Sequence, residues 1–247
     1  MCRVFSIISS KGGVGKTTVA INLAASLGRI GKKTIIIDTS IRTSDLGLYL
    51  GFVDYNYTLN DVLEGADVES SIHKLEYGMD IIPTSLSFDD RKTSLYGFNA
   101  VVDALMPLYD FIIVDTPPGL DEGSAKAIEA CSDCLIVTTT ELPSVTGAIK
   151  TALFSRNLGV NPYGIVVNKY DKNGVSVPEI ESATLLPVVS IIPEDRHVKK
   201  AQILKEPVAV SSPFSRASIE FGRLSSNICG EKYDEPNMLR KIICRFK

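Results

Sequence analysis

A glycine- and lysine-rich segment near the N-terminus carries the residue types of a phosphate-binding loop. Residues 9–18 read SSKGGVGKTT and directly follow an apolar run that begins at Val4. Gly12, Gly13 and Gly15 allow a tight turn whose backbone N–H groups point inward at an anion. The sequence therefore predicts a strand, a phosphate-binding loop and a helix in this order.

The residues around these glycines have the types that hold a nucleoside triphosphate. Lys16 can reach the β- and γ-phosphates, and the Thr17 hydroxyl can ligate Mg²⁺. A helix expected from Lys16 to Arg29 adds the positive end of its dipole. The residues predicted to bind nucleotide in this loop are Lys11, Gly12, Gly13, Val14, Gly15, Lys16, Thr17 and Thr18.

The loop departs at one position from the general pattern G-x-x-x-x-G-K-[ST], because Ser10 stands where the first glycine is usual. A second lysine, Lys11, lies five residues before Lys16. KGGVGKTT resembles the deviant Walker A loop of the MinD/ParA family, also called the signature-lysine ATPases. The resemblance implies that Lys11 reaches the nucleotide of a second subunit, and that the chain forms a homodimer around ATP and Mg²⁺.

Length and composition agree with a globular enzyme. The 247 residues are 45% hydrophobic and 22% charged, enough for one large domain with its own core. A net charge of −3 gives no overall positive field, which argues against DNA as a partner. Five cysteines without a signal peptide predict a reduced, cytoplasmic chain, and no apolar run reaches the length of a membrane span.

Short apolar runs alternate with helical segments along the chain. This alternation predicts an α/β fold with a doubly wound, mostly parallel sheet and helices on both faces, as in P-loop NTPases. Strands are expected at Val4–Ser9, Thr34–Asp38, Asp80–Ile82, Asp110–Asp115, Cys134–Thr139, Tyr163–Asn168 and Val188–Ile192. Helices are expected at Lys16–Arg29, Thr58–Leu63, Asp89–Leu105, Glu122–Ala130, Ser144–Asn157, Pro178–Leu185, Glu194–Lys205 and Pro213–Ile228. Ligands in such folds bind at the carboxyl ends of the strands.

The segment after the second expected strand resembles switch I of the MinD/ParA family, which usually reads Asp-x-Asp. The first Asp matches Asp38, which by resemblance supports the Mg²⁺ shell. The second orients the attacking water, and here it is replaced by Ser40. A serine cannot accept the proton of that water, and losing the carboxylate costs on the order of 10²–10⁴-fold. We therefore expect nucleotide binding with slow hydrolysis, unless Asp45 substitutes for the missing carboxylate.

A second motif, DTPPG at residues 115–119, resembles the D-x-P-x-G switch II of the family. Asp115 ends an apolar strand, where a carboxylate can hold a Mg²⁺-bound water. The Gly119 backbone N–H is expected to contact the γ-phosphate. By resemblance the catalytic set is Lys11, Lys16, Asp38 and Asp115, and the Mg²⁺ set is Thr17, Asp38 and Asp115.

Two later strand ends are expected to hold the base. Asn168 resembles the adenine-binding asparagine of the family, and its carboxamide can both donate and accept. Pro193 is expected to lie against the base, while Asp195 either caps the next helix or meets the nucleotide. Residues 168–171 read NKYD and also fit the guanine-reading NKxD of GTPases. Lys11 favours ATP over GTP.

The pair Cys131 and Cys134 forms a C-x-x-C, and related scaffold ATPases assemble iron–sulfur clusters through such a pair. Here the pair falls at a helix–strand joint, and both histidines, His73 and His197, are distant in sequence. We therefore expect two small buried residues rather than metal ligands.

The C-terminus carries an amphipathic segment. We expect an ATPase domain over 1–228, a polar tether over 229–237 and a helix over 238–247. The apolar face of this helix consists of Leu239, Ile242, Ile243 and Phe246, and basic residues lie off that face. The segment resembles the short membrane-targeting helix that ends MinD proteins, and two copies in a dimer would raise avidity for an anionic inner leaflet. A helix docked on its own domain and a disordered tail are the alternatives.

Together these features predict a MinD-like ATPase, peripheral on the cytoplasmic face of the membrane. It would act with an activating partner protein as a spatial regulator of cell division or polar machinery. Two alternatives stay open, a ParA-like DNA or plasmid partition ATPase and a soluble scaffold that binds nucleotide with little hydrolysis.

Overall fold

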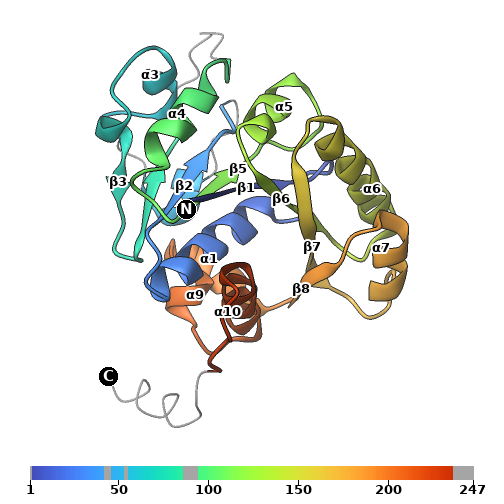
Figure 1. Ribbon diagram of the computed structural model, residues 1–247. Helices are drawn as coiled ribbons and strands as arrows, with labels where there is room; N and C mark the ends of the chain where they lie inside the picture. Colours follow the sequence, from blue (N-terminus) through green and yellow to red (C-terminus); the bar gives the residue numbers. More distant parts are fainter. Residues whose placement is uncertain (1, 42–45, 53–54, 86–93, 236–247) are drawn as a thin grey trace, which may run out of the picture.

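The structure is a computed structural model that describes residues 2–41, 46–52, 55–85 and 94–235. An eight-stranded sheet crosses the molecule in the order β3-β4-β2-β5-β1-β6-β7-β8, with helices on both faces (Figure 1). The strands are β1 (Arg3–Ile8), β2 (Thr34–Asp38), β3 (His73–Lys74), β4 (Met79–Ile82), β5 (Phe111–Asp115), β6 (Asp133–Thr138), β7 (Asn161–Tyr170) and β8 (Val188–Pro193). The β3–β4 pair is antiparallel and the other pairs are parallel, so the predicted fold class is confirmed.

The helices divide between the two faces of the sheet. They are α1 (Lys16–Arg29), α2 (Leu46–Leu50), α3 (Leu59–Leu63), α4 (Phe98–Leu105), α5 (Glu122–Glu129), α6 (Leu142–Asn157), α7 (Val177–Thr184), α8 (Arg196–Leu204), α9 (Val208–Ser211) and α10 (Arg216–Cys229), with a 3₁₀ turn at Glu69–Ser71. One apolar cluster joins α1, α8, α9 and α10 to the sheet, and two clusters on the opposite face hold α3 to α7. The sheet is thus a central layer, as Figure 1 shows.

Alternation of side chains along each strand builds these layers. Ile36 packs into the cluster under α1, whereas Ile35 and Ile37 pack into the cluster under α4. All three are fully buried, because successive residues of a strand point to opposite faces and both faces are covered. The resulting rigid sheet fixes the positions of the loops at its carboxyl edge.

The helix expected over 89–105 ends at Leu105 as predicted but begins later than predicted. Residues 89–93 lie outside the described residues, and the helix α4 begins at Phe98. Gly97 has φ = 86°, a left-handed conformation that a helix interior does not accommodate, so the helix begins directly after it. Leu95 is still buried, as a loop residue in the cluster beneath α4. The sequence prediction also missed the short elements β3, α2 and α9.

Both cysteines of the C-x-x-C are buried, as expected. Cys131 belongs to the cluster under α4 and α5, and Cys134 to the neighbouring cluster under α6. Burial raises the pKa of both thiols, that of Cys134 to about 12. In the part of the chain that the structure describes, no three His, Cys, Asp or Glu side chains are grouped so as to hold a metal ion.

The chain after α10 runs back along the domain. Tyr233 lies against Gly222 of α10, where a β-carbon would come within 2.5 Å of the tyrosine ring. Glu231 pairs with Lys32 at 2.7 Å, and Glu235 pairs with Arg223. The segment 238–247, with Leu239, Ile242, Ile243 and Phe246, lies outside the described residues. Within the described ranges, no helix combines the length and apolarity needed to cross a membrane.

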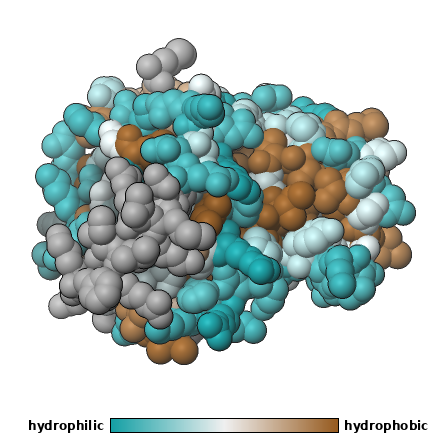
Figure 2. Space-filling view, turned by 90° about the horizontal axis from the view of Figure 1, so that it is seen from below, coloured by the Kyte–Doolittle hydropathy of each residue, from teal (hydrophilic) through white to brown (hydrophobic). Residues whose placement is uncertain are grey.

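The sheet ends at β8, whose outer side is partly uncovered. Ile191 of β8 is 37% exposed, and Leu185, directly after α7, is 77% exposed. Seen from below, hydrophobic residues gather over the right-hand part of the molecule (Figure 2), the side on which Figure 1 shows β7, β8 and α7. The strand ends at Pro193, which has no backbone N–H to donate, and this limits pairing at the sheet edge.

Candidate functional site

The loop between β1 and α1 has the backbone of a phosphate cradle. Gly13 has φ = 77° and Gly15 has φ = 94°, left-handed conformations that strain any residue with a β-carbon. Gly15 precedes Lys16, the first residue of the fourteen-residue helix α1. The helix therefore opens directly onto the loop, and its first N–H groups and its dipole favour an anion there.

Lys16 lies inside the site and not on its surface. The residue is 7% exposed. Burial lowers the pKa of Lys16, and the negative charge of Asp115 acts in the opposite direction. Asp115 ends β5, the strand next to β1, and pairs in register with Ile7. A buried ammonium group held beside a carboxylate in this way is suited to neutralise phosphate charge.

Asp38 and Asp115 end neighbouring strands in register with each other. Both are buried, 1% and 2% exposed. Asp38 Oδ1 accepts a hydrogen bond from the Ser40 backbone N–H at 2.8 Å, and Oδ2 accepts one from the Thr84 hydroxyl at 3.1 Å. Two buried carboxylates at one sheet edge, near the helix that carries Thr17, form the hard-oxygen surroundings that Mg²⁺ prefers. These residues therefore fit the ion, and Thr84 is a neighbour that the sequence prediction did not name.

The switch II loop is tied to the start of the P-loop. The Gly119 backbone N–H donates to the Ser9 carbonyl oxygen at 3.2 Å, and the Thr116 hydroxyl donates to Ile7 O at 2.8 Å. Gly119 has φ = 110°, which requires glycine. The N–H group expected to contact the γ-phosphate is thus engaged within the protein here, and contact with a phosphate would replace that bond.

Lys11 lies at the outer rim of the loop. Its Nζ forms an ion pair with Glu141 Oε2 at 2.8 Å, and both side chains are exposed, 43% and 66%. The hydrogen bond from Lys11 lowers the pKa of Glu141, as do the charges of Lys11 and Lys169. Unlike Lys16, Lys11 does not enter the phosphate cradle of this chain.

The predicted base-binding residues contact other parts of the protein. Asn168 Nδ2 donates to the Val14 carbonyl oxygen at 2.8 Å, which leaves the carboxamide oxygen of Asn168 and its second N–H for another partner. Asp195 caps α8 by accepting from the His197 N–H at 2.9 Å, and its other oxygen accepts from the Ala217 N–H of α10 at 3.1 Å. Pro193 ends β8, next to β7. Asp195 thus caps the helix, which is one of its two expected roles, and its contact with the nucleotide stays a prediction.

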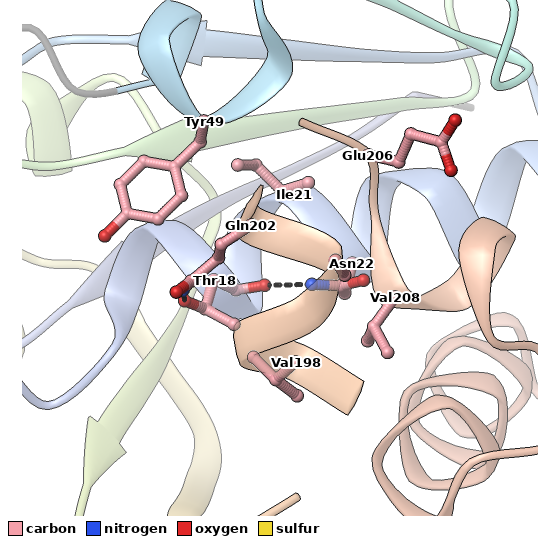
Figure 3. Close-up of a pocket in the computed structure, with 9 residues that line it drawn as sticks. Thr18, Ile21, Asn22, Tyr49, Val198, Gln202, Glu206 and Val208 are labelled. Atoms are coloured by element: carbon pink, nitrogen blue, oxygen red, sulfur yellow. Dashed lines mark hydrogen bonds between the residues drawn. The ribbon is translucent and has the colours of Figure 1, made fainter. Parts of the chain in front are cut away.

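A small pocket adjoins the loop from the side of α8 (Figure 3). Its volume is about 20 Å³, room for roughly one water molecule. Thr18 and Asn22 of α1 line it with Tyr49 and Gln202. Asn22 Nδ2 donates to Thr18 O at 2.8 Å, and Asn22 Oδ1 accepts from Ala209 N at 3.1 Å. The pocket is too small for a nucleotide. Its polar residues join α1 to α9 through Asn22 and α1 to α8 through the hydrogen bond from Gln202 Nε2 to the Thr18 hydroxyl at 3.5 Å.

Comparisons with known proteins agree with this geometry. A family model described as an AAA domain matches residues 2–157. MinD of Thermotoga maritima, described as a septum site-determining protein, is 30% identical over 94% of this chain and 89% of its own length. The chain belongs to the MinD/ParA family of P-loop ATPases.

Two further relatives support membership in this family. An uncharacterized ATP-binding protein of Methanocaldococcus jannaschii is 32% identical over 95% of this chain and 90% of its own length. The structure of Pyrococcus horikoshii MinD complexed with Mg-ADP superposes with a TM-score of 0.88 at 29% identity, covering 92% of this chain and 96% of that one. Family membership implies ATP binding and hydrolysis.

Proposed function

We propose that the chain is a MinD-like ATPase that dimerises around ATP and Mg²⁺ and binds an anionic membrane reversibly. It would act as a spatial regulator of cell division or polar machinery. Lys16 and the loop glycines would hold the phosphates, and Thr17, Asp38 and Asp115 would hold the Mg²⁺ ion. The metal would neutralise charge that develops on the phosphates, and the protein would contribute mainly positioning.

The observation that carries this proposal is the position of Lys11. Its side chain reaches outward from the P-loop and is held by an exposed ion pair with Glu141. Exposed ion pairs contribute little stability, because water screens them and two long side chains must be ordered. The phosphates of a nucleotide bound to a second subunit can therefore replace Glu141 as the partner of Lys11 at a small cost in free energy. This supports a dimer in which Lys11 acts on the partner's nucleotide.

Membrane binding rests on the C-terminal sequence. Four basic residues and an apolar face give one copy a weak affinity for an anionic surface, which a second copy in a dimer strengthens without any new contact. ATP would thereby control residence on the membrane. The described chain ends two residues before the proposed boundary of the tether, at Glu235.

Liposome co-sedimentation tests this proposal. The full chain and a chain ending at Asn237 are compared on anionic vesicles with ATP, ADP or no nucleotide, while analytical ultracentrifugation reports the dimer. ATP-dependent pelleting of the full chain, lost on truncation, is the expected result. A full chain that dimerises with ATP but does not pellet would refute membrane binding and leave the ATPase dimer standing.

A soluble scaffold with little hydrolysis is the second candidate, and Ser40 favours it. Ser40 is 8% exposed, and its backbone N–H already binds Asp38. Ser40→Asp would restore a carboxylate next to the proposed water position and raise turnover by at least about tenfold. An unchanged rate in a steady-state phosphate-release assay would contradict our account of switch I. Binding to DNA that weakens steeply with salt would instead favour a partition protein.

A further inference from the structure

Two side chains at the end of β7 donate hydrogen bonds to the P-loop. Asn168 Nδ2 reaches Val14 O at 2.8 Å, and Lys169 Nζ reaches Gly13 O at 2.9 Å. The strand β7 is not adjacent to β1, because β6 lies between them in the sheet. These contacts therefore bridge across one strand, and they connect the proposed base side of the site to its phosphate side.

The backbone at Lys169 is unusual. Lys169 has φ = 51°, a left-handed conformation that costs free energy for a residue with a β-carbon. The pairing of β7 with β8 also shifts register between Val167 and Tyr170, the segment that contains Lys169. Such conformations persist where the surroundings hold them, and they gather at functional sites. Here the irregular strand end accompanies a side chain that reaches the P-loop.

The carbonyl groups that accept these bonds belong to Gly13 and Val14, in the glycine-rich turn of the loop. The Val14 side chain is buried in the core, whereas Gly13 and Gly15 have no side chain to hold their backbone, so hydrogen bonds help to fix it. The fit is close, since a β-carbon at Gly15 would lie 2.2 Å from Asn168 Nδ2. A loop that is ordered before the nucleotide arrives loses less entropy on binding, and this raises its affinity.

We propose that Lys169 is a positioning residue that holds the P-loop in its phosphate-binding shape, together with Asn168. Lys169 is exposed, and its charge also acts on Glu141, the partner of Lys11. Lys169 would thus order the loop without touching the phosphates. This inference rests on the proposal that the loop binds ATP, and it does not depend on membrane binding.

Isothermal titration of the full chain with ADP and with a non-hydrolysable ATP analogue tests the role. Lys169→Ala keeps the β-carbon, and therefore the backbone strain, but removes the amine. We expect its Kd to rise by about three- to tenfold for both nucleotides, as the loss of one solvent-exposed hydrogen bond predicts. Lys169→Arg should restore affinity. The matched control is Lys172→Ala, an exposed lysine of the following turn, which should bind like the wild type.

A measurement on the protein without nucleotide shows whether Lys169 positions the P-loop or acts in another way. In NMR spectra of the nucleotide-free protein labelled with ¹⁵N-valine, the chemical shift of the Val14 amide should change in Lys169→Ala. It should remain that of the wild type in Lys172→Ala. Three results would overturn the inference: an unchanged Kd, a loss confined to the triphosphate, which would indicate direct phosphate contact, or a lowered melting temperature with an unmoved Val14 signal. A wild-type chain that binds neither nucleotide would refute the proposed function itself.

Discussion

The phosphate side and the base side of the candidate site are built differently. On the phosphate side, Lys16 is buried at the start of α1, and Asp38 and Asp115 are buried at the ends of β2 and β5, around a loop whose backbone is shaped by glycines. On the base side, Asn168 is bonded to the P-loop and Asp195 is bonded to α8 and α10. Residues of the first region are placed for chemistry, whereas those of the second also hold the protein together.

This difference predicts separate consequences for substitutions. A change on the phosphate side should affect nucleotide binding and turnover more than folding stability. A change on the base side should lower stability together with, or in place of, affinity. Folding stability and nucleotide affinity, measured for the same variant, therefore test whether the two sides differ in this way.

The largest expected effect is that of Lys16→Ala. Without the buried ammonium group, the phosphates lose a positive charge in a site shielded from water, and turnover should fall on the order of 10²- to 10³-fold. A phosphate-release assay measures the rate, and thermal unfolding of the protein without nucleotide serves as the control. A variant that retains most of its turnover would show that Lys16 is not part of the cradle.

Asp195→Ala should act on stability. The variant loses the helix cap at His197 and the hydrogen bond to Ala217, which together contribute about 2 kcal/mol to the free energy of unfolding. The melting temperature should therefore fall by about 4–8 °C. Urea unfolding and nucleotide titration are run on the same samples. A fall in affinity without a fall in stability would place Asp195 at the nucleotide instead.

The charge of Asp195 makes part of this stability depend on pH. Burial acts to raise the pKa of Asp195, but hydrogen bonds from the His197 and Ala217 N–H groups and from the His197 ring outweigh it, so the pKa is lowered. The contribution is full above the unfolded pKa of about 3.9 and is lost as the pH falls through the lower folded value. In urea unfolding between pH 3 and 7, wild-type stability should decline more steeply in acid than that of Asp195→Asn. An equal pH dependence of stability in the wild type and in Asp195→Asn would contradict the stabilising role of the Asp195 charge.

The smallest expected effect is that of Glu141→Gln. The substitution removes the exposed ion pair of Lys11 and so lowers the cost of moving Lys11 to a second subunit. Because exposed pairs are weak, the ATP-dependent dimer should become only about twofold tighter. Sedimentation velocity with ATP measures this change, and Glu129→Gln, which breaks the exposed pair with Lys126, is a control remote from the loop. A weaker dimer would mean that Glu141 itself contributes to the interface.

The sequence predicted the phosphate side more completely than the base side. The bounds of α1 and β2 match the expected ones to the residue, because glycine spacing and continuous apolar runs are strong local signals. The reach of Lys169 to Gly13 could not be predicted, since it depends on how β6 spaces two distant segments and on one left-handed residue. The hydrogen bond from the Ala217 N–H to Asp195 likewise requires the packing of α10 against β8, whereas the cap of α8 by Asp195 is local and was expected from the sequence. The short elements β3 and α2 are too brief for periodicity to reveal.

The position of β1 in the sheet has a consequence for how the chain is made. Arg3 pairs with Phe111 and Phe5 with Asp133, so the first strand to leave the ribosome is flanked by strands synthesised much later. At cellular rates of synthesis, the interval before β5 appears is roughly 5–20 s. During that time the apolar residues Phe5, Ile7 and Ile8 have no sheet neighbours. The nascent chain must therefore be protected from aggregation for longest at the segment that later holds the nucleotide.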